Sequence, residues 1–118
     1  MTAGQVIVIF SLGETIMINV VAVITAKPGM RDILLKEFKG NISAVHSEEG
    51  CIEYSAKIDA SGFGEIQAKY GDDVFIVIEK WESKEHLMAH AISDHMKAYS
   101  KKTKDLIADR KIHILMPA

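Results

Sequence analysis

Residues 76–100 read IVIEKWESKEHLMAHAISDHMKAYS, an apolar strand followed directly by a histidine-rich helical segment. The strand ends with Glu79 and Trp81, and the helical segment carries His90 and His95. A large aromatic side chain, a carboxylate and two imidazoles are thereby brought to one end of a sheet. Such a set can hold a flat aromatic ring and remove a proton from it. This stretch is therefore the predicted active site.

The remaining predicted elements follow from hydrophobic periodicity and from helix and turn signals. In chain order they are a strand at 16–26, a helix at 30–49, strands at 51–60 and 74–82, a helix at 83–109 with a break near 93–94, and a strand at 111–116. This order is the split βαβ pattern of a ferredoxin-like α+β sandwich with an antiparallel sheet. Residues 61–73 are rich in glycine and longer than a usual hairpin connection, so they predict a mobile loop near a pocket.

Length and composition limit the number of domains and the possible partners of the protein. The chain has 118 residues, 48% of them hydrophobic, which suits one domain, and a formal charge of -2 gives no basic field for nucleic acid. The lone Cys51 cannot form an internal disulfide, which predicts a cytoplasmic protein. The apolar run at residues 6–10 is far too short to span a membrane. We expect an N-terminal extension at 1–16 and the folded domain at 17–118.

Strand alternation divides the predicted sheet into two faces, both largely apolar. The face expected under the helices holds Ile18, Val20, Ala22, Ile24, Ile52, Tyr54, Ile58, Val74, Ile76, Ile78, Ile112 and Ile114. The opposite face is expected to hold Asn19, Val21, Val23, Glu53, Ser55, Phe75, Val77, Glu79, Trp81, His113 and Leu115. Both predicted helices cover the first face, so the apolar second face needs another cover. The sequence therefore predicts a homodimer with C2 symmetry, in which the second faces of two chains meet and a pocket lies at their junction.

Four short motifs carry a resemblance to a known family. They are Lys27-Pro28-Gly29, Glu49-Gly50-Cys51, the IEKWES run at 78–83 and Asp94-His95-Met96. Together they resemble the antibiotic biosynthesis monooxygenase (ABM) family over about residues 17–118, and HMKAYS and the closing HILMP resemble its quinol monooxygenase branch. The resemblance implies a ferredoxin-like dimeric α/β-barrel and an oxidoreductase that oxygenates aromatic diols without metal or flavin.

Departures from the patterns of particular family members indicate which of their substrates this chain does not share. Antibiotic-making members carry an asparagine where this chain has Val77. Members that degrade haem carry a histidine and an asparagine where this chain has Ser100 and Val21, which disfavours haem. The resemblance therefore predicts a cofactor-independent monooxygenase whose partners are a small aromatic substrate, a quinol or related aromatic diol, and dioxygen.

A quinol hydroxyl has a pKa near that of a phenol, about 10, and its anion gives up an electron far more readily than the neutral ring. Histidine, with an ordinary pKa of about 6.5, is the natural base at neutral pH. We therefore predict His90 as base, with Glu79 and Trp81, as the catalytic set and no metal site. The predicted substrate-binding residues are Asn19, Phe75, Val77, His95, Tyr99, His113 and Leu115.

Other interpretations of these residues remain open. Trp81 also suits a core or dimer contact, and Glu79 a structural hydrogen bond. His86 and His90 are spaced to share a metal ion, but the glutamate that follows the first histidine in zinc proteases is missing. The alternative functions are a small-metabolite isomerase or signal-processing enzyme on the same scaffold, which convergent Arg or Lys groups would favour, and a non-catalytic dimeric module that binds aromatic compounds.

Overall fold

The computed structural model describes residues 16–118. Its elements are β1 (Ile18–Ala26), α2 (Arg31–His46), β2 (Cys51–Lys57), a 3-10 turn (Gly64–Ile66), β3 (Val74–Trp81), α3 (Lys84–Ala91), α4 (Asp94–Thr103), a second 3-10 turn (Lys104–Leu106) and β4 (Ile107–Leu115). The expected N-terminal extension lies, apart from its last residue, outside the described residues.

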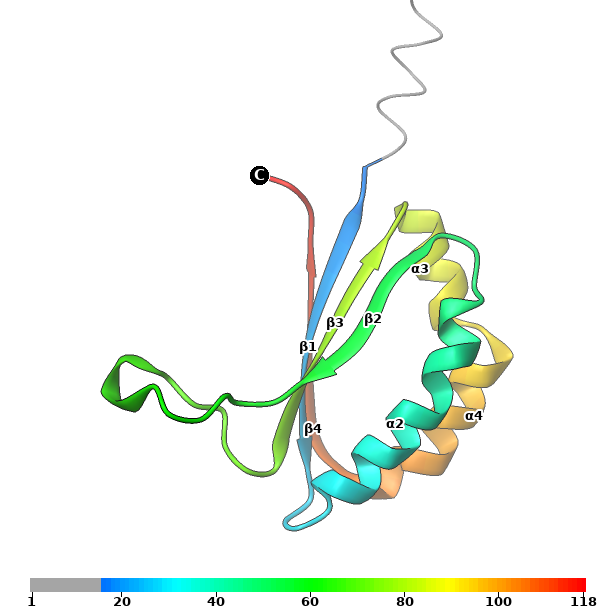
Figure 1. Cartoon of the computed structure of the whole chain (residues 1–118). Coiled ribbons are helices and arrows are strands. Elements are labelled where there is room, and N and C mark those ends of the chain that lie inside the picture. The colour runs from blue at the N-terminus through cyan, green and yellow to red at the C-terminus, as the bar shows by residue number, and fades with distance from the viewer. Residues whose placement is uncertain (1–15) are drawn as a thin grey trace, which may run out of the picture.

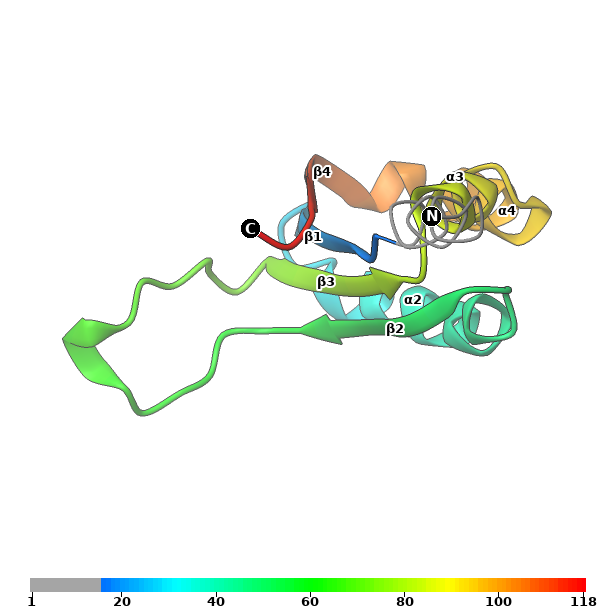
Figure 2. The ribbon, with the colours of Figure 1, turned by 90° about the horizontal axis from the view of Figure 1, so that it is seen from above.

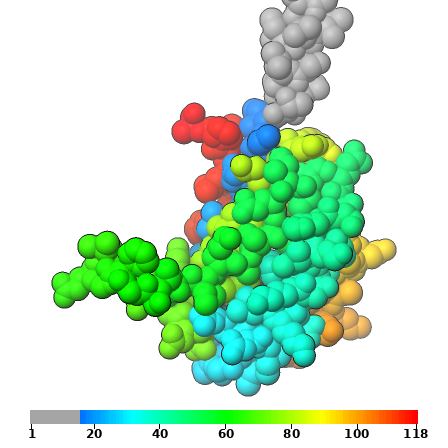
Figure 3. Space-filling view, in the orientation of Figure 1, coloured from blue at the N-terminus to red at the C-terminus, as the bar shows by residue number. Residues whose placement is uncertain are grey.

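The four strands form one antiparallel sheet in the order β2-β3-β1-β4. Helices α2, α3 and α4 all lie on the same face of that sheet, and residues 58–73 extend as an arm on the opposite side (Figure 1, Figure 2). The space-filling view shows the arm standing clear of the body (Figure 3). The predicted ferredoxin-like α+β fold is confirmed.

The hydrophobic core lies between this sheet and α2. Leu34, Phe38 and Val45 recur along one face of α2 and are buried against the sheet. The Phe38 ring stacks on Tyr54 of β2 at a centroid distance of 4.9 Å and meets Phe75 of β3 edge-on at 5.8 Å. These aromatic contacts fix the distance between α2 and the sheet.

The predicted face assignment is wrong for β3. The register pairs Phe75, Val77, Glu79 and Trp81 with Ile24, Ala22, Val20 and Ile18 of β1. Directly paired residues in an antiparallel sheet share a face, so these four β3 side chains lie under the helices and Val74, Ile76 and Ile78 lie on the open face. The run VFIVI is apolar at every position, so alternation alone could not set its phase.

Smaller differences concern β2. Tyr54 is buried under the helices as predicted, whereas Ile52 and Ile58 are exposed. The pairing of β2 with β3 shifts between Cys51 and Glu53, which turns Cys51 toward the core in place of Ile52. Ile58 lies just beyond the end of the strand.

The predicted break in the second helical segment is confirmed. Helix α3 ends at Ala91, and Ser93 begins α4 as its N-cap by accepting a hydrogen bond from the Met96 backbone N–H. Ser83 caps α3 in the same way, through the His86 backbone N–H. The segment turns back earlier than expected, so β4 starts at Ile107 instead of Lys111.

Candidate active site

A cavity of about 310 Å³ lies between the sheet and the helices of the single chain. Its volume is at the lower end of the range for small-molecule sites, roughly 300–1,000 Å³. Most of its wall is apolar or aromatic, with Phe38 from α2, Tyr54 from β2 and Met96 from α4 among the lining residues. Exposed residues Ser100 and Arg110 also line it, so the cavity opens between α4 and β4.

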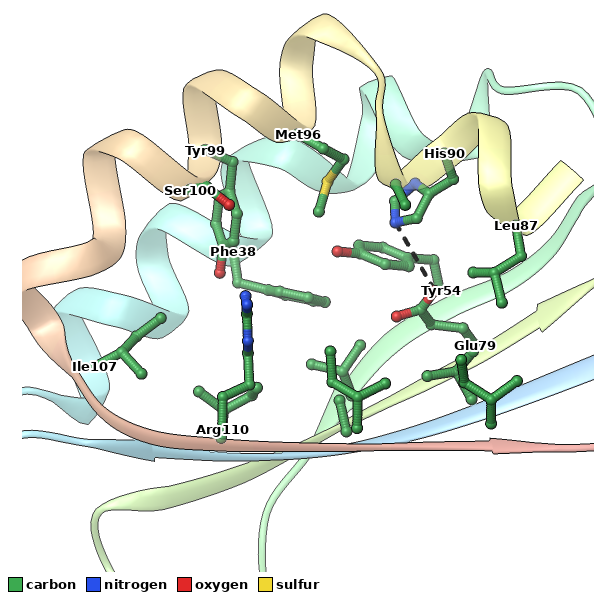
Figure 4. Close-up of a pocket in the computed structure, with 17 residues that line it drawn as sticks. Phe38, Tyr54, Glu79, Leu87, His90, Met96, Tyr99, Ser100, Ile107 and Arg110 are labelled. Carbon is green, nitrogen blue, oxygen red and sulfur yellow. Dashed lines mark ion pairs between the residues drawn. The ribbon is translucent and has the colours of Figure 1, made fainter.

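His90 and Glu79 form a polar pair at one end of the cavity (Figure 4). The His90 residue is only 4% exposed and Glu79 8% exposed. The Nε2 atom of His90 lies 3.8 Å from Oε1 of Glu79, a separation too long for a hydrogen bond. The two groups are therefore not hydrogen-bonded to each other, but they are close enough for a charge on one to affect the other.

Trp81 contacts Glu79 from the core, on the side away from the cavity. Its indole Nε1–H donates to Oε1 of Glu79 at 2.9 Å, and its ring lies 4.6 Å from the His90 ring between centroids. The side chain is completely buried and does not line the cavity. Trp81 thus supports both polar groups as part of the core.

Burial determines which groups can act as a base. It raises the pKa of the Glu79 carboxyl, although the hydrogen bond from Trp81 and the nearby His90 oppose the rise. Burial also raises the pKa of Tyr99 to about 12 and pushes the pKa of Tyr54 still further above its ordinary value. Both phenols remain protonated at neutral pH, which leaves His90 and Glu79 as the candidate bases.

A second carboxylate, Glu48, lies on the other side of His90. Its Oε2 is 2.8 Å from Nδ1 of His90 and 2.6 Å from Nε2 of His95. The ligand atoms of these three residues lie within 4.8 Å of one another, the arrangement expected of a possible metal site. However, two ligands of a tetrahedral ion at about 2.0–2.1 Å are roughly 3.3 Å apart. The observed separations instead match charge-assisted hydrogen bonds.

The structure brings together only some of the residues predicted from the sequence. His90, Glu79, Val77 and Tyr99 line the cavity. Trp81 and Phe75 are buried next to it, and His95 joins the cluster around Glu48. Asn19, His113 and Leu115 occupy the open face of the sheet, so this cavity does not use them. The cavity lies inside one chain, whereas the sequence predicted a pocket at a dimer junction.

The sequence of this chain matches one family model. Residues 17–102 match the model described as antibiotic biosynthesis monooxygenase. The chain belongs to this family. Among curated relatives, the Escherichia coli K12 protein named "Probable quinol monooxygenase YgiN" is 37% identical over 103 residues, which cover 86% of this chain and 98% of the relative.

Solved structures share the same fold as this ABM-family chain. A crystal structure of a Pseudomonas aeruginosa protein aligns with a TM-score of 0.74 at 24% identity, covering 89% of this chain and 97% of that one. A conserved protein from Methanosarcina mazei aligns with a TM-score of 0.75 at 22% identity, covering 92% and 99%. At these identities the likeness shows the fold alone.

Several cavity residues of this ABM-family chain were not predicted from the sequence. Arg110 extends from β4 toward Tyr99, at the end of the cavity away from His90 (Figure 4). It pairs with Ile24, which places it on the helix side of the sheet. The sequence analysis began the last strand at Lys111 and so gave Arg110 no face. Glu48, which contacts His90 but does not line the cavity, was also missed, because it lies in the turn after α2, 42 residues from His90 in sequence.

Replacing Glu79 by glutamine is expected to stabilise the fold at neutral and higher pH. A raised carboxyl pKa means that the folded chain holds this proton to higher pH than the unfolded chain does, so the contribution of Glu79 to wild-type stability falls as the pH rises above 4.5, the ordinary value. Glutamine removes this loss and can still accept the Trp81 hydrogen bond. Thermal melts between pH 4.5 and 8 should show a growing advantage for Glu79→Gln.

The exposed Glu82, three residues further along the chain, provides the control. Glu82→Gln should melt with the wild type at every pH in this range. A Glu79→Gln variant that is less stable than wild type throughout would show that the ionised carboxylate is a net stabilising group, contrary to this expectation.

Proposed function

We propose that this protein is a cofactor-independent monooxygenase that oxidises quinols or related aromatic diols with dioxygen. The observation that carries the proposal is the buried imidazole of His90, which faces an apolar cavity beside Glu79. Membership of the ABM family and the name of the E. coli relative support the same activity. His90 acts as the base in this proposal, and Glu79 stabilises the charge that His90 gains.

The polar groups of the cavity suit a 1,4-diol. His90 and Glu79 lie at one end, and Arg110 lies at the other with Tyr99 (Figure 4). The two hydroxyls of a quinol are on opposite sides of its ring, so one can reach the base while the other approaches the guanidinium. Phe38, between these ends, supplies an apolar surface for the ring.

The proposed reaction needs no cofactor because the quinolate itself is the reductant. Nε2 of His90 takes a hydroxyl proton, and the quinolate passes one electron to dioxygen to form a semiquinone and superoxide. The two radicals combine at a ring carbon to form a peroxide, which takes the proton back from His90. Its oxygen–oxygen bond then breaks with loss of water, which leaves a hydroxyquinone. One quinol and one dioxygen thus give one hydroxyquinone and one water, with a new carbon–oxygen bond and a broken oxygen–oxygen bond.

The lining of the cavity favours this reaction over chemistry on a polar metabolite. Arg110 is the only Arg or Lys residue among the lining residues in the described part of the chain. An isomerase or signal-processing enzyme for a phosphorylated or highly polar compound would need several converging cations. A non-catalytic module that binds aromatic compounds would use the same cavity, and the experiment below separates it from an enzyme.

The test is single-turnover oxygenation of reduced menadione. Metal-free protein is mixed with the quinol without oxygen, dioxygen labelled with ¹⁸O is admitted, and the products are analysed by mass. We expect faster quinol consumption than in buffer and one labelled oxygen in the hydroxyquinone. Binding of the quinol with an unaltered background rate would establish the binding module instead. A quinone product without label, accompanied by peroxide, would show an oxidase and overturn the monooxygenase.

We also propose that the protein works in the cytoplasm. Within residues 16–118, none of the helices combines the length and the apolarity required to cross a bilayer. Burial raises the pKa of the Cys51 thiol, the chain's single cysteine, which keeps it in the unreactive thiol form. A single, partly buried cysteine that stays a thiol suits a reducing compartment.

We further propose that two chains pair through the open faces of their sheets. Among the described residues, no helix covers this face of the sheet (Figure 1). The register places Val21, Val23 and Ile78 along its centre. The arm beside it exposes large apolar side chains, with Phe63 59% and Ile66 88% exposed. A second copy would cover this apolar surface with C2 symmetry.

Replacing Val21 by glutamate should weaken the dimer. Val21 lies between Ile78 of β3 and His113 of β4, so the change would place a carboxylate at the centre of the paired surfaces. We expect the dissociation constant to rise about ten- to a hundredfold, measured by sedimentation velocity over a range of protein concentrations. Ile33→Glu, at an exposed position of α2, is the matched control and should sediment as the wild type does. A Val21→Glu chain with unchanged self-association would rule out this face as the interface.

A further inference from the structure

The carboxylate of Glu48 lies between two histidine rings, one facing the cavity and one facing solvent. A single oxygen, Oε2, is 2.8 Å from Nδ1 of His90 and 2.6 Å from Nε2 of His95. The exposed fractions of the side chains are 5% for His90, 13% for Glu48 and 31% for His95. The short separations and the low exposure of Glu48 distinguish this cluster from a loose surface ion pair.

An ionised carboxylate can only accept hydrogen bonds, so both nitrogens that contact Glu48 carry hydrogens. For His90 this places the proton on Nδ1. The neutral ring then has its lone pair on Nε2, the atom directed toward Glu79 and the cavity. In the opposite tautomer Nε2 would carry a hydrogen and could not take a proton from a substrate.

The fold fixes these contacts through a break between two helices. His90 and His95 are five residues apart, which on one continuous helix would separate their side chains by about 140°. Ending α3 at Ala91 and restarting the helix after Ser93 lets both rings reach the same oxygen. The Ser93 hydroxyl also donates to the His90 carbonyl at 2.8 Å, which ties the two helices together.

Glu48 itself is held by the turn that follows α2. Its backbone N–H donates to the Val45 carbonyl at 3.0 Å, and its own carbonyl accepts from the Cys51 N–H at 3.3 Å. Gly50 in this turn has a φ of +82°, a backbone conformation that favours glycine. A side chain at that position would also overlap the His86 ring. The turn therefore presents the Glu48 carboxylate at a defined place.

We propose that Glu48 is the positioning residue for the His90 base and that His95 anchors Glu48. Glu48 keeps His90 in the Nδ1–H form, with Nε2 open to the substrate hydroxyl, and it stabilises the ring once Nε2 has taken the proton. His95 donates to the same oxygen and prevents the carboxylate from rotating away. This inference rests on the proposed function, since it assigns a role in activating the same base.

The first test is kinetic and uses two neighbouring glutamates. Glu48→Gln removes the charge with little change of shape and should lower the rate of quinol oxidation about ten- to a hundredfold, less than removal of the base itself. Glu49→Gln is the matched control, since the Glu49 side chain is 93% exposed, and it should retain the wild-type rate. His95→Asn should give a smaller loss than Glu48→Gln. Addition of formate to Glu48→Ala should restore part of the activity, because formate can supply the missing carboxylate.

The second test does not depend on activity. ¹⁵N NMR of the histidine rings should show His90 protonated on Nδ1 in the wild-type protein and in Glu49→Gln, and a changed tautomer in Glu48→Ala, which has no acceptor for the Nδ1 hydrogen. Wild-type turnover with an equally active Glu48→Gln variant would overturn the inference and leave the proposed function intact. A Glu48→Ala variant whose His90 tautomer is unchanged would also overturn it. A wild-type protein without oxygenase activity would defeat the proposed function, and the tautomer measurement would still decide what Glu48 does to His90.

Discussion

Replacing His90 by alanine is expected to lower the rate of quinol oxidation by a factor of about 10² to 10⁴, the usual contribution of a general base. The quinol would keep its apolar contacts in the cavity, so its affinity should change much less than its turnover. The His90 imidazole faces the cavity, and its Nε2 atom lies 3.8 Å from Oε1 of Glu79, too far for a hydrogen bond. Nε2 is therefore free to take a proton from the quinol. Stopped-flow measurement of quinol consumption by the wild-type protein and by His90→Ala gives the ratio of the two rates.

His86 provides the matched control for this measurement. It lies one helical turn before His90 on α3 and does not line the cavity. His86→Ala should oxidise the quinol at close to the wild-type rate, which separates loss of the base from loss of any histidine in the helix. If His90→Ala were as active as wild type, His90 would not be the base, and Glu79, the other candidate, would take its place.

The sequence predicted the elements of this fold well because their signals are local. The apolar spacing of α2, the helix start at Ser83 and the helix break near Ser93 depend on nearby residues alone. These signals were sufficient to give the order of strands and helices and, through it, the ferredoxin-like topology. Even the helix break that directs His90 and His95 toward Glu48 was visible as Ser93-Asp94.

The phase of β3 could not be predicted, and it determined where the site was expected. Apolar side chains occupy both faces of this strand, so a shift of one residue satisfies the same alternation. The partner strand decides the matter, because β1 pairs Val20 with Glu79 and Ile18 with Trp81. With the opposite phase, Glu79 moves to the open face, and the predicted pocket moves with it to a dimer junction.

The residues that were missed belong to contacts between segments distant in sequence. Arg110 lies within β4 because the strand begins at Ile107, and its position in the strand sets the face of the sheet on which it lies. The start of β4 depends on the single turn that follows α4. Glu48 sits in an acidic pair with Glu49, and no local pattern distinguishes the buried carboxylate from its exposed neighbour. Tertiary packing alone makes one of them a partner of His90.

Replacing Trp81 by alanine should destabilise the protein by about 3–5 kcal/mol, the usual cost of truncating a large buried aromatic side chain. Trp81 is fully buried and packs in the same core cluster as Phe38 and Val20. It is also the hydrogen-bond donor to Glu79. Urea unfolding at pH 7, followed by circular dichroism at low temperature, measures the loss.

Trp81→Phe separates these two contributions. Phenylalanine keeps much of the packing but has no N–H, so the buried Glu79 carboxylate loses its donor, at a cost of about 1–3 kcal/mol. In a Glu79→Gln background, Trp81→Phe should lower the free energy of unfolding by a smaller amount, because an uncharged amide without the indole donor is less costly to bury than a carboxylate without it. An equal cost in both backgrounds would show that the indole acts by packing alone. Since Trp81 does not line the cavity, Trp81→Phe should also bind the quinol with nearly wild-type affinity, and a large loss of affinity would show that the indole contacts the substrate directly.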